Sequence, residues 1–330
     1  MFFLILLISS MISISANSWM GMWIGLEINL LSIIPLMNSI KNSYSSESSI
    51  KYFITQALSS CIMLFSVILM MKMNSLSVNM PNLFSMIFNS AMFTKMGAAP
   101  FHFWFPEIME GLTWMNCLMM LTWQKIAPMV LSAYNYMNLY FITMIIMFSM
   151  LISGILGLNQ ISIRKILTYS SINHIGWMIT SFLILETLWI YYFIIYSFSI
   201  TVLIITLNLY NINNLKQLFT FMNKNLMIYV FIIMNFMSIS GLPPFIGFMP
   251  KWLTIQIMIN NNLIFIVYFM IMTTLISIYF YLRTMFTSLN LSINESMFIN
   301  QDFNNKFILL TMNFINISLL PICSMIFNFT

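Results

Sequence analysis

Four ionisable residues lie inside stretches that are otherwise apolar enough to sit in a membrane. They are Glu27 in WIGLEINLL, Lys95 in FTKMGAAPF, Lys125 in LTWQKIAPM and Lys251 in FIGFMPKWL. One charge at the centre of a membrane helix opposes insertion by about 2.5 to 3.5 kcal/mol, so four oppose it by roughly 10 kcal/mol unless they are paired or hydrated. Residues of this kind usually mark a path for protons or ions. His174 in SSINHIGWM is a fifth, weaker candidate.

Lysine is chemically suited to such a path. Burial weakens the hold of a lysine on its proton, and a nearby carboxylate strengthens it again. Movement of Glu27 toward or away from Lys95 would therefore switch the lysine between holding and releasing a proton. Arginine could not take this role, because it stays protonated in proteins.

Lys95 and Lys251 share a setting, since each lies beside a cluster of glycine and proline: KMGAAPFHFWFP in the first case and SGLPPFIGFMPK in the second. Proline removes a backbone donor and interrupts a helix. At membrane depth the freed carbonyls are tolerated only where protein or water satisfies them. The two stretches therefore predict broken helices that line a hydrated path.

A simpler interpretation stays open at this point. Glu27 could form a structural ion pair with one lysine while the other lysines reach an interface, and the glycine and proline clusters could coincide by chance in a Phe-rich chain. The chain would then be a purely structural membrane subunit whose buried charges are inert.

The composition defines the elements that must position these residues. Of 330 residues, 61% are hydrophobic and 6% are charged, whereas about a quarter of a soluble protein is charged. Apolar runs long enough to cross roughly 30 Å of hydrocarbon recur along the chain. The run at 139–158 is apolar all round, unlike the alternating strands of a β-barrel. We therefore expect an all-α polytopic membrane protein, with residues 1–330 forming a single membrane domain.

We expect about eleven transmembrane helices. They cover roughly residues 2–20, 22–40, 52–72, 83–104, 113–135, 138–158, 167–185, 188–209, 226–248, 261–283 and 307–327. Lys95 then falls on the fourth helix of a first five-helix repeat, residues 1–136, and Lys251 on the fourth helix of a second, residues 137–285. Because five is odd, the repeats are inverted, as in many secondary transporters. Residues 286–330 add a loop and a final helix.

Basic residues in short loops predict the orientation. The second, sixth, eighth and tenth loops hold most of them: Lys41, Lys51, Arg164, Lys165, Lys216, Lys224, Arg283 and Lys306. The N-terminus and these loops are therefore expected on the cytoplasmic side or its organellar equivalent, and the C-terminus on the other side. The net charge of +5 does not form a solvent-facing stripe, so no nucleic-acid partner is expected. The basic loops could hold anionic membrane lipids, including cardiolipin.

No cofactor site is expected on this chain. The three cysteines, Cys61, Cys117 and Cys323, lack the paired spacing of zinc, iron–sulfur or redox motifs. The sequence also has no glycine-rich phosphate loop of the Rossmann or Walker kind.

Six segments carry a family resemblance: WIGLEINLLSIIPL, SSIKYFITQA, KMGAAPFHFWFPEIMEG, WQKIAP, SSINHIGWM and SGLPPFIGFMPKW. In this order and at these separations they resemble the antiporter-like membrane subunits of respiratory complex I, the mitochondrial NADH:ubiquinone oxidoreductase, in the animal, insect-like form. The resemblance spans residues 20–255. It implies that the chain lacks the first three of the fourteen helices in bacterial members, so neighbouring subunits must cover part of its flank.

The resemblance also implies a role for each candidate residue. Glu27 matches the switch glutamate, Lys95 its partner and gate, Lys125 the central proton-relay lysine, and Lys251 the terminal lysine at the exit. His174 occupies a position where a relay role is plausible.

A location and partners follow from the same resemblance. They are the mitochondrial inner membrane, with the N-terminus in the matrix and the C-terminus in the intermembrane space, and the other membrane-arm subunits of complex I, including neighbouring antiporter-like subunits. NADH, FMN, iron–sulfur clusters and ubiquinone are expected in those partners. The alternative is a stand-alone cation/proton antiporter of the same ancestry, which would exchange ions without an NADH-oxidising partner.

Overall fold

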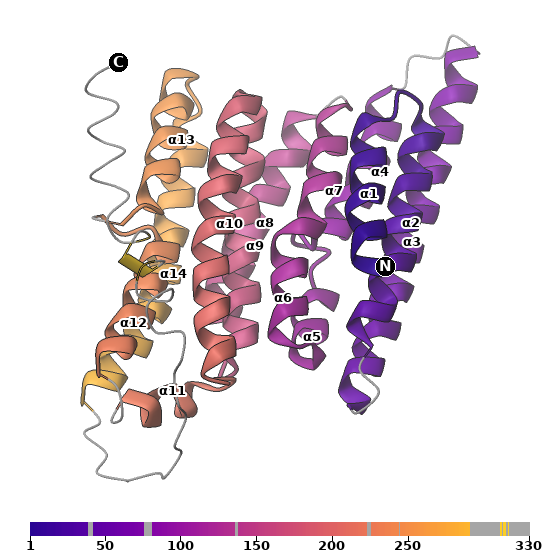
Figure 1. The fold of residues 1–330 in the computed structure, drawn as a ribbon. Coiled ribbons are helices and arrows are strands. Elements are labelled where there is room, and N and C mark those ends of the chain that lie inside the picture. Colours follow the sequence, from indigo (N-terminus) through magenta and orange to yellow (C-terminus); the bar gives the residue numbers. More distant parts are fainter. Residues whose placement is uncertain are drawn as a thin grey trace. The chain divides into compact units, whose positions relative to one another are not determined.

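The computed structural model describes residues 1–38, 42–75, 81–135, 138–222, 226–243 and 245–290, together with residues 311, 313, 314 and 316. Within these residues the chain forms fourteen helices, α1 to α14, and no strand beyond one isolated bridge between Ser162 and Asn214 (Figure 1). The chain divides into two compact units, Met1–Ser149 and Met150–Thr330. The all-α fold predicted from the apolar runs is therefore confirmed.

The first unit is built from seven helices and the start of an eighth. They are α1 (Phe2–Ser15), α2 (Trp19–Met37), α3 (Ser43–Ser75), α4 (Pro81–Met96), α5 (Trp104–Gly111), α6 (Trp114–Leu121), α7 (Trp123–Ala133) and the first part of α8 (Leu139–Gly157). Helices α1 and α2 lie side by side. Their contact is close because Gly25 of α2 faces Ser13 of α1, where an added Cβ would lie 2.7 Å from the Ser13 nitrogen. Small residues allow membrane helices to approach in this way.

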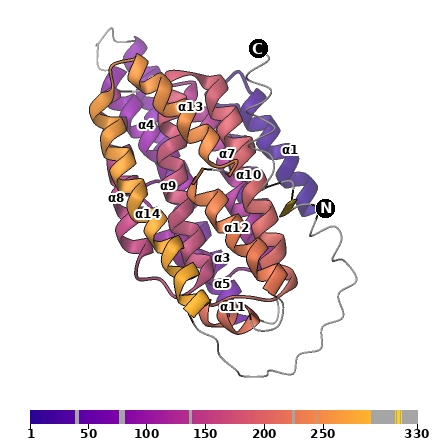
Figure 2. The ribbon, with the colours of Figure 1, turned by 90° about the vertical axis from the view of Figure 1, so that its left-hand side faces the viewer.

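The second unit holds the rest of α8 and six further helices. They are α9 (Ile163–Ile184), α10 (Glu186–Leu209), α11 (Leu215–Met222), α12 (Leu226–Ser240), α13 (Phe248–Asn260) and α14 (Ile264–Asn290). Helix α9 is its centre, because α9 is buried from residue 166 to residue 181. Helix α13 follows α12 in the same general direction after a short break (Figure 2).

Five of these helices are long and apolar enough to cross a membrane, within the residues described. Large apolar side chains on them are exposed, among them Leu58, Met144 and Leu275, which suits contact with lipid tails. Buried hydroxyls are satisfied inside their own helices, because the serine or threonine donates to the carbonyl three residues earlier, as Ser66 does to Met63. An α-helix makes its backbone hydrogen bonds within itself, so apolar helices of this kind can cross hydrocarbon. The fold is therefore that of a polytopic membrane protein.

Helix α4 ends at the first predicted break. Gly97 has a φ of +76°, a conformation that glycine adopts without the penalty of a Cβ. The Ala98 N–H then donates to the Phe93 carbonyl at 3.0 Å, and the Phe101 N–H donates to the Ala98 carbonyl at 2.9 Å. These bonds close α4 before α5 begins.

Helix α12 ends in the same way. Gly241 has a φ of +78°, the Leu242 N–H donates to the Met237 carbonyl at 3.4 Å, and the Phe245 N–H donates to the Leu242 carbonyl at 2.9 Å. Each glycine stands four residues before its phenylalanine and seven before the next helix. The glycine of each cluster therefore ends a helix in the same way, once in each unit.

Several stretches that hydropathy predicts as loops are helical. Residues 43–51 begin α3, residues 105–111 lie in α5, residues 215–222 form α11 and residues 249–260 lie in α13. Hydropathy predicts one ninth span over residues 226–248. The structure instead ends α12 at Ser240 and begins a separate helix, α13, at Phe248, and α13 carries Lys251. Hydropathy misses these helices because they carry polar and charged side chains, which contact solvent or neighbouring helices.

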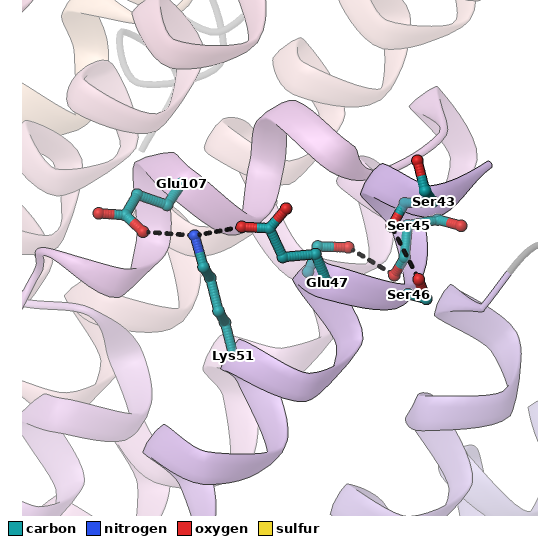
Figure 3. A network of polar contacts seen from close by, with 7 residues as sticks. Ser43, Ser45, Ser46, Glu47, Lys51 and Glu107 are labelled. Carbon is teal, nitrogen blue, oxygen red and sulfur yellow. Dashed lines mark hydrogen bonds and ion pairs between the residues drawn. The ribbon is translucent and has the colours of Figure 1, made fainter.

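The predicted second and fourth loops lie at the same end of the first unit. Lys51 of α3 donates to Glu107 of α5 at 2.9 Å and pairs with Glu47 at 2.9 Å (Figure 3). Lys41, Lys224, Lys306 and most of the predicted final helix, 307–327, lie outside the described residues.

Candidate functional site

Lys95 lies in the last turn of α4, two residues before the break at Gly97. Its side chain is 7% exposed and borders a small cavity of the first unit with room for about one water molecule. The lining residues are Leu26, Asn29, Leu30, Tyr52, Gln56, Lys95, Gln124 and Pro128. Helices α2, α3, α4 and α7 thus bring polar side chains around the Lys95 ammonium.

Glu27 lies in the middle of α2 and is half-buried. Its carboxylate attracts the Lys95 ammonium electrostatically, although the two groups form no direct ion pair among the described residues. The first unit therefore places the predicted switch and gate within electrostatic reach of each other without locking them together.

Two amides join the helices that carry Glu27 and Lys125. Asn29 Nδ2 donates to Gln124 Oε1 at 2.8 Å, and Gln124 Nε2 donates to Asn29 Oδ1 at 3.1 Å. Asn29 stands two residues after Glu27 on α2, and Gln124 directly precedes Lys125 on α7. A paired amide bridge of this kind satisfies polar groups that hydrocarbon would leave unpaired.

Lys125 is almost completely buried, with 1% exposure. It lies in the first turn of α7, directly after an interruption at Thr122 that separates α6 from α7. The Lys125 Nζ atom lies 5.6 Å from the centroid of the Phe105 ring, a distance at which the ring face attracts a cation. The Phe105 ring also packs against Gly97, so one aromatic side chain contacts both the break after Lys95 and the Lys125 ammonium.

Lys251 lies in the first turn of α13, after the second break. Its Nζ donates to the Ser240 carbonyl at 2.7 Å, so the side chain reaches back to the broken end of α12. The same atom lies 5.9 Å from the Trp177 ring centroid. Gly241 leaves the space for this path, because an added Cβ would lie 2.9 Å from the Lys251 Nζ.

His174 lies on α9 and contacts the neighbouring carbonyl of the same broken end. Its Nε2 is 3.1 Å from the Ile239 carbonyl oxygen, and its Nδ1 is 2.9 Å from the Tyr192 hydroxyl oxygen. A carbonyl only accepts, so Nε2 donates to it, and the Tyr192 hydroxyl donates to Nδ1 when the imidazole is neutral. On protonation the Nδ1–H would donate to the Tyr192 oxygen instead, so His174 can gain a proton and keep both bonds.

The structure thus gathers the sequence candidates into two groups. Glu27 and Lys95 belong to the first unit with Lys125, whereas His174 and Lys251 meet at successive carbonyls of α12 in the second.

Sequence reasoning missed the supporting residues, which are Asn29, Gln56, Phe105, Gln124, Trp177 and Tyr192. Polar residues inside apolar runs could have indicated the amides. No cluster of three His, Cys, Asp or Glu side chains occurs in the described part of the chain.

The sequence model of one family matches residues 16–277, a range that contains all five candidate residues. That family is described as NADH:quinone oxidoreductase/Mrp antiporter, transmembrane. The match covers more than half of the chain, so the chain belongs to this family of antiporter-like membrane proteins.

Curated relatives place it more narrowly. The chain is 45% identical to NADH-ubiquinone oxidoreductase chain 2 of Anopheles gambiae, over 99% of this chain and 97% of the mosquito protein. It is 41% identical to the protein of the same name from Locusta migratoria, over 97% of this chain and 91% of the other. The resemblance seen in the sequence, with its insect-like form, is therefore confirmed.

Solved structures share the fold. A chain in respiratory complex I from Thermus thermophilus with bound aureothin superposes with a TM-score of 0.82 at 20% identity, over 97% of this chain and 77% of that one. A chain of the Mrp complex from Dietzia sp. gives a TM-score of 0.76 at 15% identity, over 86% of this chain and 59% of that one.

Proposed function

We propose that this chain is a proton-translocating, antiporter-like core subunit of respiratory complex I in the mitochondrial inner membrane. Relatives that are 45% and 41% identical over nearly the whole chain are named as chain 2 of NADH-ubiquinone oxidoreductase. The chain would then act as part of an H⁺-translocating NADH:ubiquinone reductase while carrying no redox site. NADH, FMN, iron–sulfur clusters and ubiquinone belong to partner subunits in this proposal.

One observation carries the proton-translocation proposal. Lys95, Lys125 and Lys251 are each more than nine-tenths buried, and each lies within four residues of an end of a helix at an interruption. A buried ammonium group opposes membrane insertion. Lysines at such positions therefore usually have a function that offsets this cost. Helix interruptions at membrane depth occur where the backbone lines a cavity or a path.

In the proposed path Glu27 is the switch, and its distance from Lys95 controls how firmly that lysine holds its proton. Lys125 is the central relay and Lys251 is the output. His174 takes part as an intermediate carrier, supported by its ability to exchange donor and acceptor roles with Tyr192. The proposed layout is two inverted five-helix repeats, residues 1–136 and 137–285, followed by a loop and a last helix in 286–330, which makes about eleven transmembrane helices.

The proposed orientation has the N-terminus in the matrix and the C-terminus in the intermembrane space, following the basic loops. The proposed partners are the other membrane-arm subunits, including neighbouring antiporter-like subunits. Anionic lipids such as cardiolipin would contact the matrix-side basic residues.

A native gel of detergent-solubilised membranes tests membership of the complex. The gel is stained for NADH oxidation and the active band is analysed by mass spectrometry. Peptides of this chain in the active band are expected. Because the matching family also includes Mrp antiporters, the alternative is a stand-alone cation/proton antiporter. Migration only as a small species without NADH oxidation would establish that alternative and overturn the proposal.

A further inference from the structure

The cavity beside Lys95 has the properties of a site that holds a water molecule. It lies inside the first unit, and it is lined mainly by polar or charged side chains from four helices. Its size suits about one water molecule, and a buried water needs two to four polar partners.

Gln56 supplies a donor that no described protein group uses. It lies on α3 and is 4% exposed, and its Nε2 is fully buried without a hydrogen-bond partner among the described residues. Leaving a buried donor unpaired costs about 1 to 3 kcal/mol. Asn29 and Gln124 line the same cavity, but their amides pair with each other. Gln56 lines this cavity, so its amide can hydrogen-bond to a molecule held there.

Lys95 needs the same kind of partner. No hydrogen bond joins its ammonium to another group in the part of the chain that the structure describes, although three N–H donors project from it. A metal cation does not suit the cavity, because the ammonium repels it. A water oxygen can accept from Lys95, and the same water can hydrogen-bond to the Gln56 amide and to the hydroxyl of Tyr52, which stands one helical turn before Gln56.

We propose that this cavity binds one ordered water that solvates the Lys95 ammonium, and that Gln56 is the residue that positions it. Gln56 acts by positioning this water and does not itself contact the transferred proton. The inference rests on the proposed function only for its consequence in proton transfer. The water site itself is a property of the first unit.

A high-resolution density map of the assembled complex tests the site directly. We expect an ordered water within hydrogen-bonding distance of both Lys95 Nζ and the Gln56 amide, and we expect its density to disappear in the Gln56→Met variant. An empty cavity in the unmodified chain overturns the inference. So does a water that contacts Lys95 and stays unchanged in Gln56→Met. Neither result bears on membership of the complex.

Turnover in H₂O and D₂O gives a readout that packing alone would not change. In assembled Gln56→Met, coupled NADH:quinone turnover should fall by roughly 2- to 10-fold, the factor that one lost hydrogen bond is worth. The ratio of rates in H₂O and D₂O should rise, while KM for the quinone stays unchanged. Gln256→Met, at an exposed position on α13, is the matched control. An unchanged isotope ratio in Gln56→Met overturns the positioning role.

Discussion

At the scale of single residues, aromatic rings contact two of the three buried lysine ammonium groups. Lys125 faces the Phe105 ring, and Lys251 faces Trp177 while donating to the Ser240 carbonyl. A ring face attracts a cation electrostatically, and a carbonyl oxygen accepts a hydrogen bond from an ammonium group.

Tyr192 should matter for proton transfer through its hydroxyl rather than through its ring. Tyr192→Phe leaves His174 Nδ1 without its donor, so we expect coupled proton pumping to fall by roughly 2- to 10-fold. The measurement is quenching of a pH-sensitive dye in vesicles that contain the assembled complex. Tyr196→Phe is the control, because the Tyr196 ring packs 4.9 Å from His174 but the hydrogen bond to Nδ1 comes from Tyr192. Equal pumping in the two variants would contradict the assignment.

At the scale of elements, the breaks place the lysines. Gly97 and Gly241 end α4 and α12 in the same conformation, yet the lysines approach the breaks differently. Lys95 lies on the helix before its break, and Lys251 lies on the helix after its break and reaches back. The two breaks thus share the positive φ of their glycine and differ in the position of the charge.

Gly241→Ala should damage both the break and the lysine beside it. A non-glycine residue at a φ of +78° is strained by about 1 to 2 kcal/mol, and the new Cβ would contact Lys251. We expect a lower temperature of half-inactivation and reduced pumping in the complex that still assembles. Gly154→Ala is the control, since its Cβ would lie 3.4 Å from Ile276 in ordinary contact. Similar losses in both variants would refute the special role of Gly241.

Much of this element-scale picture follows from sequence patterns. Apolar runs predict the long helices, and the glycine and proline clusters predict both breaks, because these signals are local. The interruption at Thr122 was not predicted, since no glycine or proline marks it. Phe105 and Trp177 were not singled out either, because an aromatic residue in an apolar run has the same appearance whether it contacts lipid or a lysine.

At the scale of the whole molecule, the orientation depends on which ends of the helices face the matrix. In the second unit α11 lies at one end and the turn from α13 to α14 lies at the other (Figure 1). The basic-loop pattern predicts the α11 end in the matrix. This prediction concerns the direction of the proposed proton path across the membrane.

Single cysteines at two exposed positions test the orientation. A membrane-impermeant thiol reagent should label Asn261→Cys in intact mitoplasts, and it should label Asn214→Cys only after the inner membrane is permeabilised. Both positions are exposed in the second unit. A difference in labelling therefore reports which side of the membrane each position faces. Labelling in the reverse pattern would invert the assigned orientation.

The central claim is that buried lysines of this chain carry the pumped protons, and Lys125→Met tests it most directly. Methionine keeps the length and packing of the side chain but holds no proton. Proton pumping and coupled NADH:quinone turnover are measured in the assembled complex, with Lys72→Met at an exposed position as control. The account predicts near-normal assembly with strongly reduced pumping for Lys125→Met and little change for Lys72→Met. Normal coupled pumping in an assembled Lys125→Met complex would contradict it.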